Sequence, residues 1–454
     1  MNTKKKIDGV LDGPILPSML KFAIPLILSG LLQQLYSTAD TLIVGAMGGK
    51  EALAAVGATG STVSLLVTVF VSIFVGTDLL IARAKGNGDD DSLRRTVATS
   101  YVISLVFGII LLTAGEILAK PMMLLTGCPD NVIDGATLYL RIYFLAMPGS
   151  MFVNFASSVI RSSGNSRSPF IYLSISGFCN VLGNIILVLT IGDPVAAVAI
   201  STTLSVYISA ALFFIHLVKD KGATGLRPFA LSFHTPTFAK IIRYGIPSAI
   251  SSTTFTLTNL IFQPIINSYG DNGISGTSAA AAIEGYLFII TQSIGTAVAT
   301  FMGQNIGAGN KERVRRILIR GYALNVSIAA VFTVVALSIG KFLLGFFIPG
   351  EAEAIDFGYL RMNVVIGFSV LNAISNVNKG AMQSYGYTFV QMIANVIGIS
   401  FLSVAWALFV YPLAPSALTF LLNYPVTWFI TASFLLVYVT VLTKRYLKGK
   451  DFKL

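Results

Sequence analysis

The feature that most constrains this chain is a series of apolar segments, each long enough to cross a lipid bilayer. A membrane-spanning helix needs about 20 consecutive, mostly apolar residues. Twelve runs meet this requirement, at residues 20–47, 52–81, 97–119, 139–160, 170–191, 195–218, 241–268, 274–302, 321–347, 360–382, 389–411 and 417–442. We therefore predict an all-α polytopic membrane protein with twelve transmembrane helices.

The composition agrees with a lipid environment and excludes an ordinary water-soluble protein. Hydrophobic residues make up 54% of the 454 residues and charged residues only 11%, whereas soluble domains carry about 25% charged residues. The net charge of +11 does not indicate nucleic acid as a partner, because membrane proteins gather Lys and Arg in loops on one side of the bilayer. We expect the lipid bilayer and a small molecule as the partners of this chain.

The distribution of Lys and Arg predicts an orientation for the twelve spans. With the N-terminus inside the cell, 26 of the 31 Lys and Arg residues fall in or beside cytoplasmic segments. The positive-inside rule therefore places both termini in the cytoplasm, which requires an even number of spans. We expect a multi-pass protein of the bacterial cytoplasmic (inner) membrane.

The two sets of six spans repeat each other in sequence, at offsets of 220 to 222 residues. The matched segments are Lys21-Phe-Ala-Ile-Pro25 with Arg243-Tyr-Gly-Ile-Pro247, Gly86-x-Gly88 with Gly307-x-Gly309, Tyr139-Leu-Arg141 with Tyr359-Leu-Arg361, and Arg161-Ser-x-Gly164 with Gln383-Ser-x-Gly386. Because each half holds an even number of spans, the halves share one topology and are related by a pseudo-two-fold axis along the membrane normal. We predict an N-lobe at 1–218, a cytoplasmic linker at 219–240 and a C-lobe at 241–454. Such a duplication favours an alternating-access carrier.

Motifs in both halves resemble those of a known transporter family. In the first half they are Phe22-Ala-Ile-Pro25, Gln33-Gln34-Leu-Tyr36-Ser-Thr-Ala-Asp40-Thr and Leu53-Ala-Ala-Val56-Gly57. In the second half they are Ala280-Ala-Ala-Ile-Glu284-Gly285 and Gly303-Gln-Asn-Ile-Gly-Ala-Gly309. Over essentially its whole length the chain is similar to the multidrug and toxic compound extrusion (MATE) family. The resemblance implies a two-lobed antiporter that exports drugs or metabolites against an inward flow of H⁺ or Na⁺.

Two alternatives to a multidrug antiporter remain open. The first is an exporter or flippase of one endogenous metabolite or lipid-linked precursor. The second is a membrane-embedded enzyme, against which the sequence has no His-rich cluster, Ser/Lys dyad or phosphate-cradling loop. We therefore expect a transporter and not an enzyme, with no cofactor and no metal other than a coupling ion. A monomer would suffice, since one chain contains both lobes.

Acidic residues inside the membrane are costly and usually mark ion or substrate paths. Asp78, near the inner boundary of its span, is expected to anchor the fold. Asp40 and Glu284 are predicted to lie deeper, and neither acid is repeated in the other half. This lack of repetition favours a lobe-specific role for each, although a buried acid whose charge is satisfied by hydrogen bonds is the alternative in both cases.

A polar face on the fifth span accompanies Asp40. Asn180 and Asn184 are four residues apart and therefore lie on one side of a helix. The resemblance implies a cation site formed by Asp40, Asn180, Asn184 and Thr202, at which Na⁺ or H⁺ would bind. We expect Asn180, Asn184 and Tyr139 to adjust the protonation of Asp40. Some family members carry Asp at the second span-five position. With Asn184 here, fewer anionic oxygens are available for Na⁺, which favours H⁺.

The resemblance also implies a hinge and a substrate cavity. Protonation of Asp40 would bend the first span at Pro25, although a proline near a helix start is tolerated in any case. Glu284 is expected to attract lipophilic organic cations, helped by aromatic faces. The other cavity candidates are Gln33, Gln34, Tyr36, Phe255, Asn259, Gln263, Phe288 and Gln292. The alternative for these side chains is that they face lipid or link helices.

Overall fold

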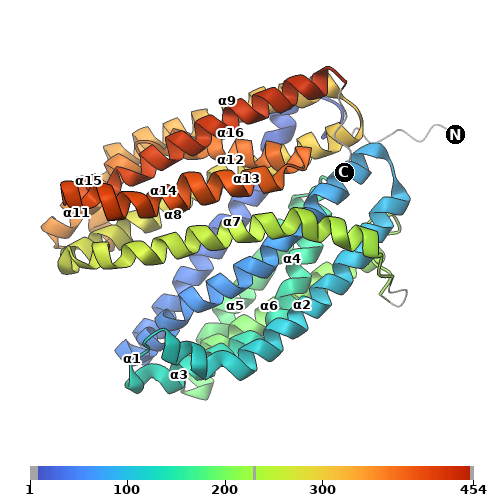
Figure 1. The fold of residues 1–454 in the computed structure, drawn as a ribbon. Helices are drawn as coiled ribbons and strands as arrows, with labels where there is room; N and C mark the ends of the chain where they lie inside the picture. The colour runs from blue at the N-terminus through green and yellow to red at the C-terminus, as the bar shows by residue number, and fades with distance from the viewer. Residues whose placement is uncertain (1–8, 229–231, 450–454) are drawn as a thin grey trace. The chain divides into compact units, whose positions relative to one another are not determined.

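The computed structural model describes residues 9–228 and 232–449, and every regular element within them is a helix (Figure 1). The described part of the predicted linker is accordingly 219–228 and 232–240. The α-helices are α1 (Ile15–Asn87), α2 (Asp90–Leu125), α3 (Asp130–Leu145), α4 (Met147–Ser162), α5 (Arg167–Ile191), α6 (Pro194–Lys219), α7 (Thr235–Asn267), α8 (Gly270–Gly307), α9 (Lys311–Ser338), α10 (Gly340–Phe347), α11 (Ala352–Val365), α12 (Ser369–Tyr385), α13 (Thr388–Asn395), α14 (Leu402–Ala405), α15 (Ala417–Leu421) and α16 (Asn423–Leu447). Between α13 and α15 the helix takes a π form at η1 (Val396–Phe401) and η2 (Trp406–Val410), and a short 3₁₀ turn follows at η3 (Tyr411–Leu413).

The helices of the described residues accommodate the twelve predicted spans. Eight helices, from α1 to the run ending at Leu447, are long and apolar enough to cross a membrane, and the bent pairs α3–α4 and α11–α12 can each form one more span. The 73-residue α1 contains two predicted spans, and α7 coincides with the predicted seventh span without being one of these eight helices. The fourth and tenth spans are therefore broken helices, each bent by 48°, where the sequence indicated continuous ones.

Glycine marks the points where the backbone must leave the helix. Within α1 the backbone at Gly49 has φ 73° and ψ −168°, a conformation open to glycine but strained for other residues. This break separates the first two spans. Gly88 and Gly309, a pair matched in the sequence repeat, have φ values of 70° and 71°. The repeat is thus present in the backbone as well as in the sequence.

The chain forms two compact units whose boundaries differ from those of the two sequence halves. One unit comprises Ile24–Ala249, and the other comprises Met1–Ala23 together with Ile250–Leu454. The first residues of α1 therefore belong with the second half, and the first residues of α7 belong with the first half. Each sequence half thus contributes the beginning of its first helix to the unit that contains most of the other half.

Close contacts hold both exchanged segments in place. In the unit that contains the C-terminus, Phe22 packs edge-on against Phe301 with 5.6 Å between the ring centroids. Arg313 of α9 donates hydrogen bonds to backbone carbonyls of residues 9, 10, 12 and 13. In the other unit, the backbone of α7 at Ile241 packs directly against Gly76, where a Cβ atom would come within 2.8 Å of the Ile241 Cα. These contacts make the exchange a packed part of each core.

Small residues allow α8 and α12 to pack backbone against backbone. A Cβ atom on Gly295 would lie 2.6 Å from the carbonyl oxygen of Asn376, and one on Gly380 would overlap the carbonyl oxygen of Gly295. Close helix contacts of this kind are a main source of association between helices in a bilayer, where the hydrophobic effect does not drive them together. Gly285, also on α8, has no atom within 4 Å of the position a Cβ would take.

We predict that Gly295→Ala destabilises the protein and that Gly285→Ala does not. The new methyl group at position 295 must push α12 away, and overpacking of this kind costs about 1–3 kcal/mol. The apparent melting temperature of the detergent-solubilised protein measures the effect, and Gly285→Ala is the matched control on the same helix. Equal melting temperatures for the two variants would contradict the close packing of α8 and α12.

Candidate functional site

Four acidic residues fall inside the predicted spans, and three of them form an ion pair with an arginine. Asp78 pairs with Arg161 at 3.3 Å, Glu116 with Arg141 at 3.9 Å, and Glu284 with Arg361 at 2.8 Å. The fourth, Asp40, takes part in none of the ion pairs in the described part of the chain. This difference separates Asp40 from the acids that neutralise a neighbouring cation.

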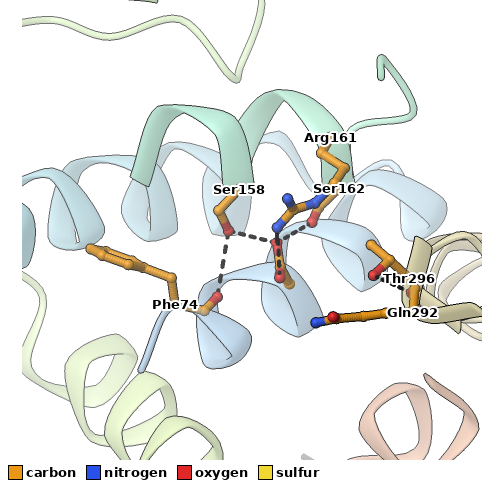
Figure 2. A network of polar contacts seen from close by, with 7 residues as sticks. Phe74, Ser158, Arg161, Ser162, Gln292 and Thr296 are labelled. Atoms are coloured by element: carbon orange, nitrogen blue, oxygen red, sulfur yellow. Dashed lines mark hydrogen bonds and ion pairs between the residues drawn. The ribbon is translucent and has the colours of Figure 1, made fainter. Parts of the chain in front are cut away.

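Asp78 is the centre of a polar network in the unit Ile24–Ala249. Its Oδ1 atom accepts hydrogen bonds from Ser158 Oγ at 2.6 Å and from Ser162 Oγ at 2.7 Å. Figure 2 shows these two hydroxyls and the Arg161 guanidinium turned toward the same point, from one side of α4. The network joins α1 to α4, as expected of an anchoring residue.

Glu284 of α8 forms a buried, bidentate pair with Arg361 of α11. Arg361 Nε donates to Glu284 Oε1 at 2.9 Å, and the NH2 group donates to Oε2 at 2.8 Å. Both residues are buried, and the Arg361 guanidinium also lies 5.3 Å from the ring centroid of Tyr424. The arginine offsets the negative charge on which the expected attraction of cations to Glu284 depended. Glu284 is thus a buried acid paired with an arginine in this structure.

Asp40 lies among neutral polar groups from α5 and α6. The Nδ2 atom of Asn184 donates to Asp40 Oδ1. Asn180, one turn earlier on α5, donates through Nδ2 to Thr202 Oγ1 at 3.2 Å, and its carbonyl oxygen accepts from Ser201 Oγ at 2.8 Å. Asn180 and Asn184 are buried, while Asp40 is partly accessible. The polar residues predicted around Asp40 thus lie on helices that surround it in one unit.

Two tyrosines of α3 complete the surroundings of Asp40. Tyr139 and Tyr143 stack with 6.0 Å between their ring centroids and an interplanar angle of 17°. Both are close enough to Asp40 to interact with its charge. Their hydroxyl groups place two further dipoles near the carboxylate, without a full positive charge.

The expected cavity residues are divided between the two units. Tyr36 belongs to the unit of Asp40 and packs on α5, where its ring fills the space beside Gly177 that a side chain would need. Gln33 and Gln34 are exposed on the same helix. In the other unit, Phe255, Asn259, Gln263 and Gln292 are exposed, and Phe288 packs edge-on against Trp428 at 6.0 Å.

The partners of the charged residues and a polar group on α12 were not predicted from the sequence. Arg361 lies at the start of the tenth predicted span, and its repeat match with Arg141 indicates a structural role in both halves. On α12, Asn376 Nδ2 donates to Asn372 Oδ1 at 2.9 Å and to Thr291 Oγ1 of α8 at 3.3 Å. The spacing of four residues between the two asparagines was the available signal.

We predict that Glu284→Gln lowers stability strongly and that the double variant Glu284→Met/Arg361→Met recovers most of the loss. The single variant leaves an unpaired buried guanidinium, which costs about 3–5 kcal/mol, whereas replacing a whole buried pair by apolar residues is often neutral. Thermal unfolding in detergent measures both variants. Lys120→Ala, which removes an exposed pair with Asp134, serves as the control with an effect below about 1 kcal/mol. A Glu284→Gln variant as stable as the wild type would contradict a structural role for the pair.

The comparison with protein families finds one match in each half of the chain. The MatE family model matches residues 25–186 and 247–409. The two matches begin at Pro25 and Pro247, which are equivalent positions of the sequence repeat. The duplication and the family resemblance are therefore properties of the same segments.

Curated relatives and solved structures agree with this assignment. The probable multidrug resistance protein YoeA of Bacillus subtilis (strain 168) is 26% identical over 390 residues, covering 84% of each chain. An FAD transporter of Shewanella oneidensis (strain ATCC 700550 / JCM 31522 / CIP 106686 / LMG 19005 / NCIMB 14063 / MR-1) is 20% identical, covering 69% of this chain and 70% of its own. An outward-facing structure of a multidrug resistance MATE family transporter of the MOP superfamily superposes with a TM-score of 0.90 at 19% identity, covering 99% of this chain and 100% of its own. The chain is a membrane protein of the MatE family of transporters, with the twelve-helix, two-lobe fold of that family.

Proposed function

We propose that this protein is a cation-coupled antiporter that exports small organic molecules across the bacterial cytoplasmic membrane, with Asp40 as the coupling carboxylate. Both termini would lie in the cytoplasm, in agreement with the distribution of Lys and Arg. The duplicated halves support an alternating-access mechanism. One chain would be sufficient for transport.

The observation that carries this proposal is the lack of a cationic partner for Asp40 among the described residues. Asp78, Glu116 and Glu284 each form an ion pair with an arginine. Among the described residues, Asp40 interacts with the amide of Asn184 and the hydroxyl of Tyr139, and a carboxylate removed from water without a counter-ion favours uptake of a cation. Asp40 is therefore the span acid whose charge is best suited to change during transport.

Asn184 can support both states of Asp40. Its Nδ2 atom donates to the carboxylate, while its buried Oδ1 atom has no hydrogen-bond partner. Rotation of the amide by 180° would present Oδ1 to a protonated Asp40, which is then a donor. An ionised aspartate at position 184 could accept but could not donate, so the asparagine fits a cycle of protonation and deprotonation.

The coupling ion is H⁺ or Na⁺, and the residues at the site favour H⁺. A Na⁺ ion requires several oxygen ligands, whereas Asp40 is the one anionic group of this cluster. The amides of Asn180 and Asn184 are partly engaged with Thr202 and Asp40. A single exchangeable proton on Asp40 requires no further ligands.

The conformational step is proposed to involve the first span at Pro25. In this structure α1 is helical through Pro25, and Ser29 Oγ donates to the Pro25 carbonyl at 2.8 Å. Proline lacks the N–H that would bond to the carbonyl one turn earlier. Pro25 also follows the boundary at Ala23 and Ile24 where α1 passes from one unit to the other. A weak point in the helix at this boundary suits a hinge.

Lipophilic organic cations and other drugs are the proposed substrates, because the YoeA protein is described as a probable multidrug resistance protein. Aromatic groups such as Phe288 and Trp428 could contact such molecules. Export of one endogenous metabolite is the second candidate, supported by the similarity to an FAD transporter. The pairing of Glu284 with Arg361 removes one argument for a strictly cationic substrate.

We predict that Asp40→Asn abolishes export of a fluorescent lipophilic cation from everted membrane vesicles. The amide cannot bind and release a proton, so export should fall to the level of vesicles that lack the protein. Wild type and variant are compared under an imposed pH gradient and then under a Na⁺ gradient, which identifies the coupling ion. The control is Glu116→Gln, which alters an acid at a partly exposed ion pair and should keep the wild-type rate.

Two outcomes would contradict parts of this proposal. Wild-type export by Asp40→Asn would show that Asp40 is structural. If the wild-type protein exports no dye under either gradient, the multidrug function is wrong, and a single metabolite becomes the better account of the substrate.

A further inference from the structure

A series of polar side chains runs along one side of α12. Asn372, Asn376 and Lys379 follow each other at spacings of four and three residues, and Ser375 lies one turn before Lys379. Residues three and four apart share a side of a helix. All four residues are partly accessible, and Gly380, the residue after Lys379, packs against Gly295 of α8.

Lys379 has no hydrogen bond or ion pair within the part of the chain that the structure describes. Glu284, the acid within the predicted spans of this unit, is occupied by Arg361 through both carboxylate oxygens. An ammonium group inside a span without a counter-ion is costly and marks a functional site by default. The charge of Lys379 is therefore available for a group that the protein itself does not supply.

A second unsatisfied donor lies one turn away. The Oγ atom of Ser375 is buried and has no hydrogen-bond partner. The amide nitrogen of Asn376 is already committed to Asn372 and Thr291. Ser375 and Lys379 thus leave a hydroxyl and an ammonium group, both donors, without acceptors on the same side of α12.

A group that offers only acceptor oxygens and a negative charge matches these two donors. Carboxylates and phosphates have this chemistry, and a charge-assisted hydrogen bond is stronger than a neutral one. Gln292 and Thr296 of α8 are accessible and lie within three residues of Gly295, which packs against α12. A neutral or cationic ligand would leave the Lys379 charge unbalanced.

We propose that this side of α12 binds an anionic group, a carboxylate or phosphate, of the exported substrate, with Lys379 as its counter-ion. The inference rests on the proposed export function and specifies the substrate class as one that carries an acid group, alone or beside a cationic one. Lys379 is six residues before the end of α12, roughly 9 Å along the helix. The charge pattern assigns this end to the cytoplasmic side, from which an exporter takes up its substrate.

A purely structural role for Lys379 makes a different prediction. A lysine near a helix end can extend its ammonium group toward water, with the stem covering apolar surface. In that case, removal of the charge would affect all substrates equally. The two roles are distinguished by a pair of ligands that differ only in one acid group.

The experiment compares a rhodamine dye that carries a free carboxylate with its methyl ester. Fluorescence anisotropy of each dye with purified protein in neutral detergent gives the Kd without any transport step. The variants are Lys379→Gln, Lys379→Arg as the charge-preserving control, and Ser375→Ala. We expect Lys379→Gln to weaken binding of the carboxylate dye by about tenfold or more, as for loss of a charged hydrogen bond, and to leave the ester unchanged. Lys379→Arg should bind both dyes like the wild type, and Ser375→Ala should weaken the carboxylate dye alone by a smaller factor.

Other outcomes would overturn the inference. An equal change for the two dyes in Lys379→Gln would show that Lys379 is structural. Equal affinity of wild type and Lys379→Gln for the carboxylate dye, or no binding of that dye by the wild type, would also contradict an anion site. If the differential binding is present but vesicles export neither dye, the anion site stands and the proposed multidrug export is wrong.

A phospholipid headgroup shares the chemistry of the proposed ligand, so a separate binding experiment must distinguish a lipid from a substrate as the source of the anion. The binding measurement is repeated with added phosphatidylglycerol and with added phosphatidylcholine. Competition by phosphatidylglycerol that disappears in Lys379→Gln would assign the site to an anionic lipid, which would overturn the substrate assignment. Unchanged binding of the carboxylate dye in both lipids supports the substrate.

Discussion

Neutralisation of charge inside the bilayer is the constraint on which the rest of this structure depends. An ion cannot be left in hydrocarbon without a partner at acceptable cost, and the fold meets this requirement by joining helices through arginine–carboxylate pairs. Asp78 with Arg161 connects α1 to α4, and Glu284 with Arg361 connects α8 to α11. These pairs use charge to fix positions in the fold. Asp40 in one unit and Lys379 in the other take part in none of the ion pairs among the described residues. We propose that these two groups of opposite sign respond to an ion and to a ligand, respectively.

Much of the fold was predictable because its main signals are local. Each span is an uninterrupted apolar run, and in a bilayer such a run has essentially one solution, the α-helix, because its backbone hydrogen bonds must be satisfied within the segment. The repeat followed from motifs such as Tyr139-Leu-Arg141 and Tyr359-Leu-Arg361. The breaks in the fourth and tenth spans were not predictable from hydrophobicity, since the residues on both sides of Ala146 are as apolar as those within a continuous helix. The division of α1 and α7 between the two units was also not predictable from local sequence. It depends on contacts between residues some 280 positions apart, such as Phe22 with Phe301.

The candidate site was predictable to the extent that it depends on helix periodicity and family motifs. Asn180 and Asn184 lie on one side of α5 at the spacing the sequence gives them, and Asn184 contacts Asp40. Glu284 could not be resolved in the same way. An isolated glutamate in an apolar run looks the same whether it attracts a substrate or meets an arginine from another helix, and its partner is 77 residues away. Lys379 was counted among the cytoplasmic charges, because a single lysine near the cytoplasmic end of a span is common and does not by itself indicate a site. Pairing between distant helices is the information that decides these cases.

The exchange of the first turns of α1 and α7 between the units has a consequence for the order in which the protein can be assembled. During synthesis the residues before Ala23 emerge first, yet their packing partners, including Phe301 and Arg313, are made almost three hundred residues later. The first lobe can therefore finish packing only after α7 has been synthesised. The N-terminal segment can pack only after the second lobe has been synthesised. The exchanged ends therefore make the two halves mutually dependent for folding.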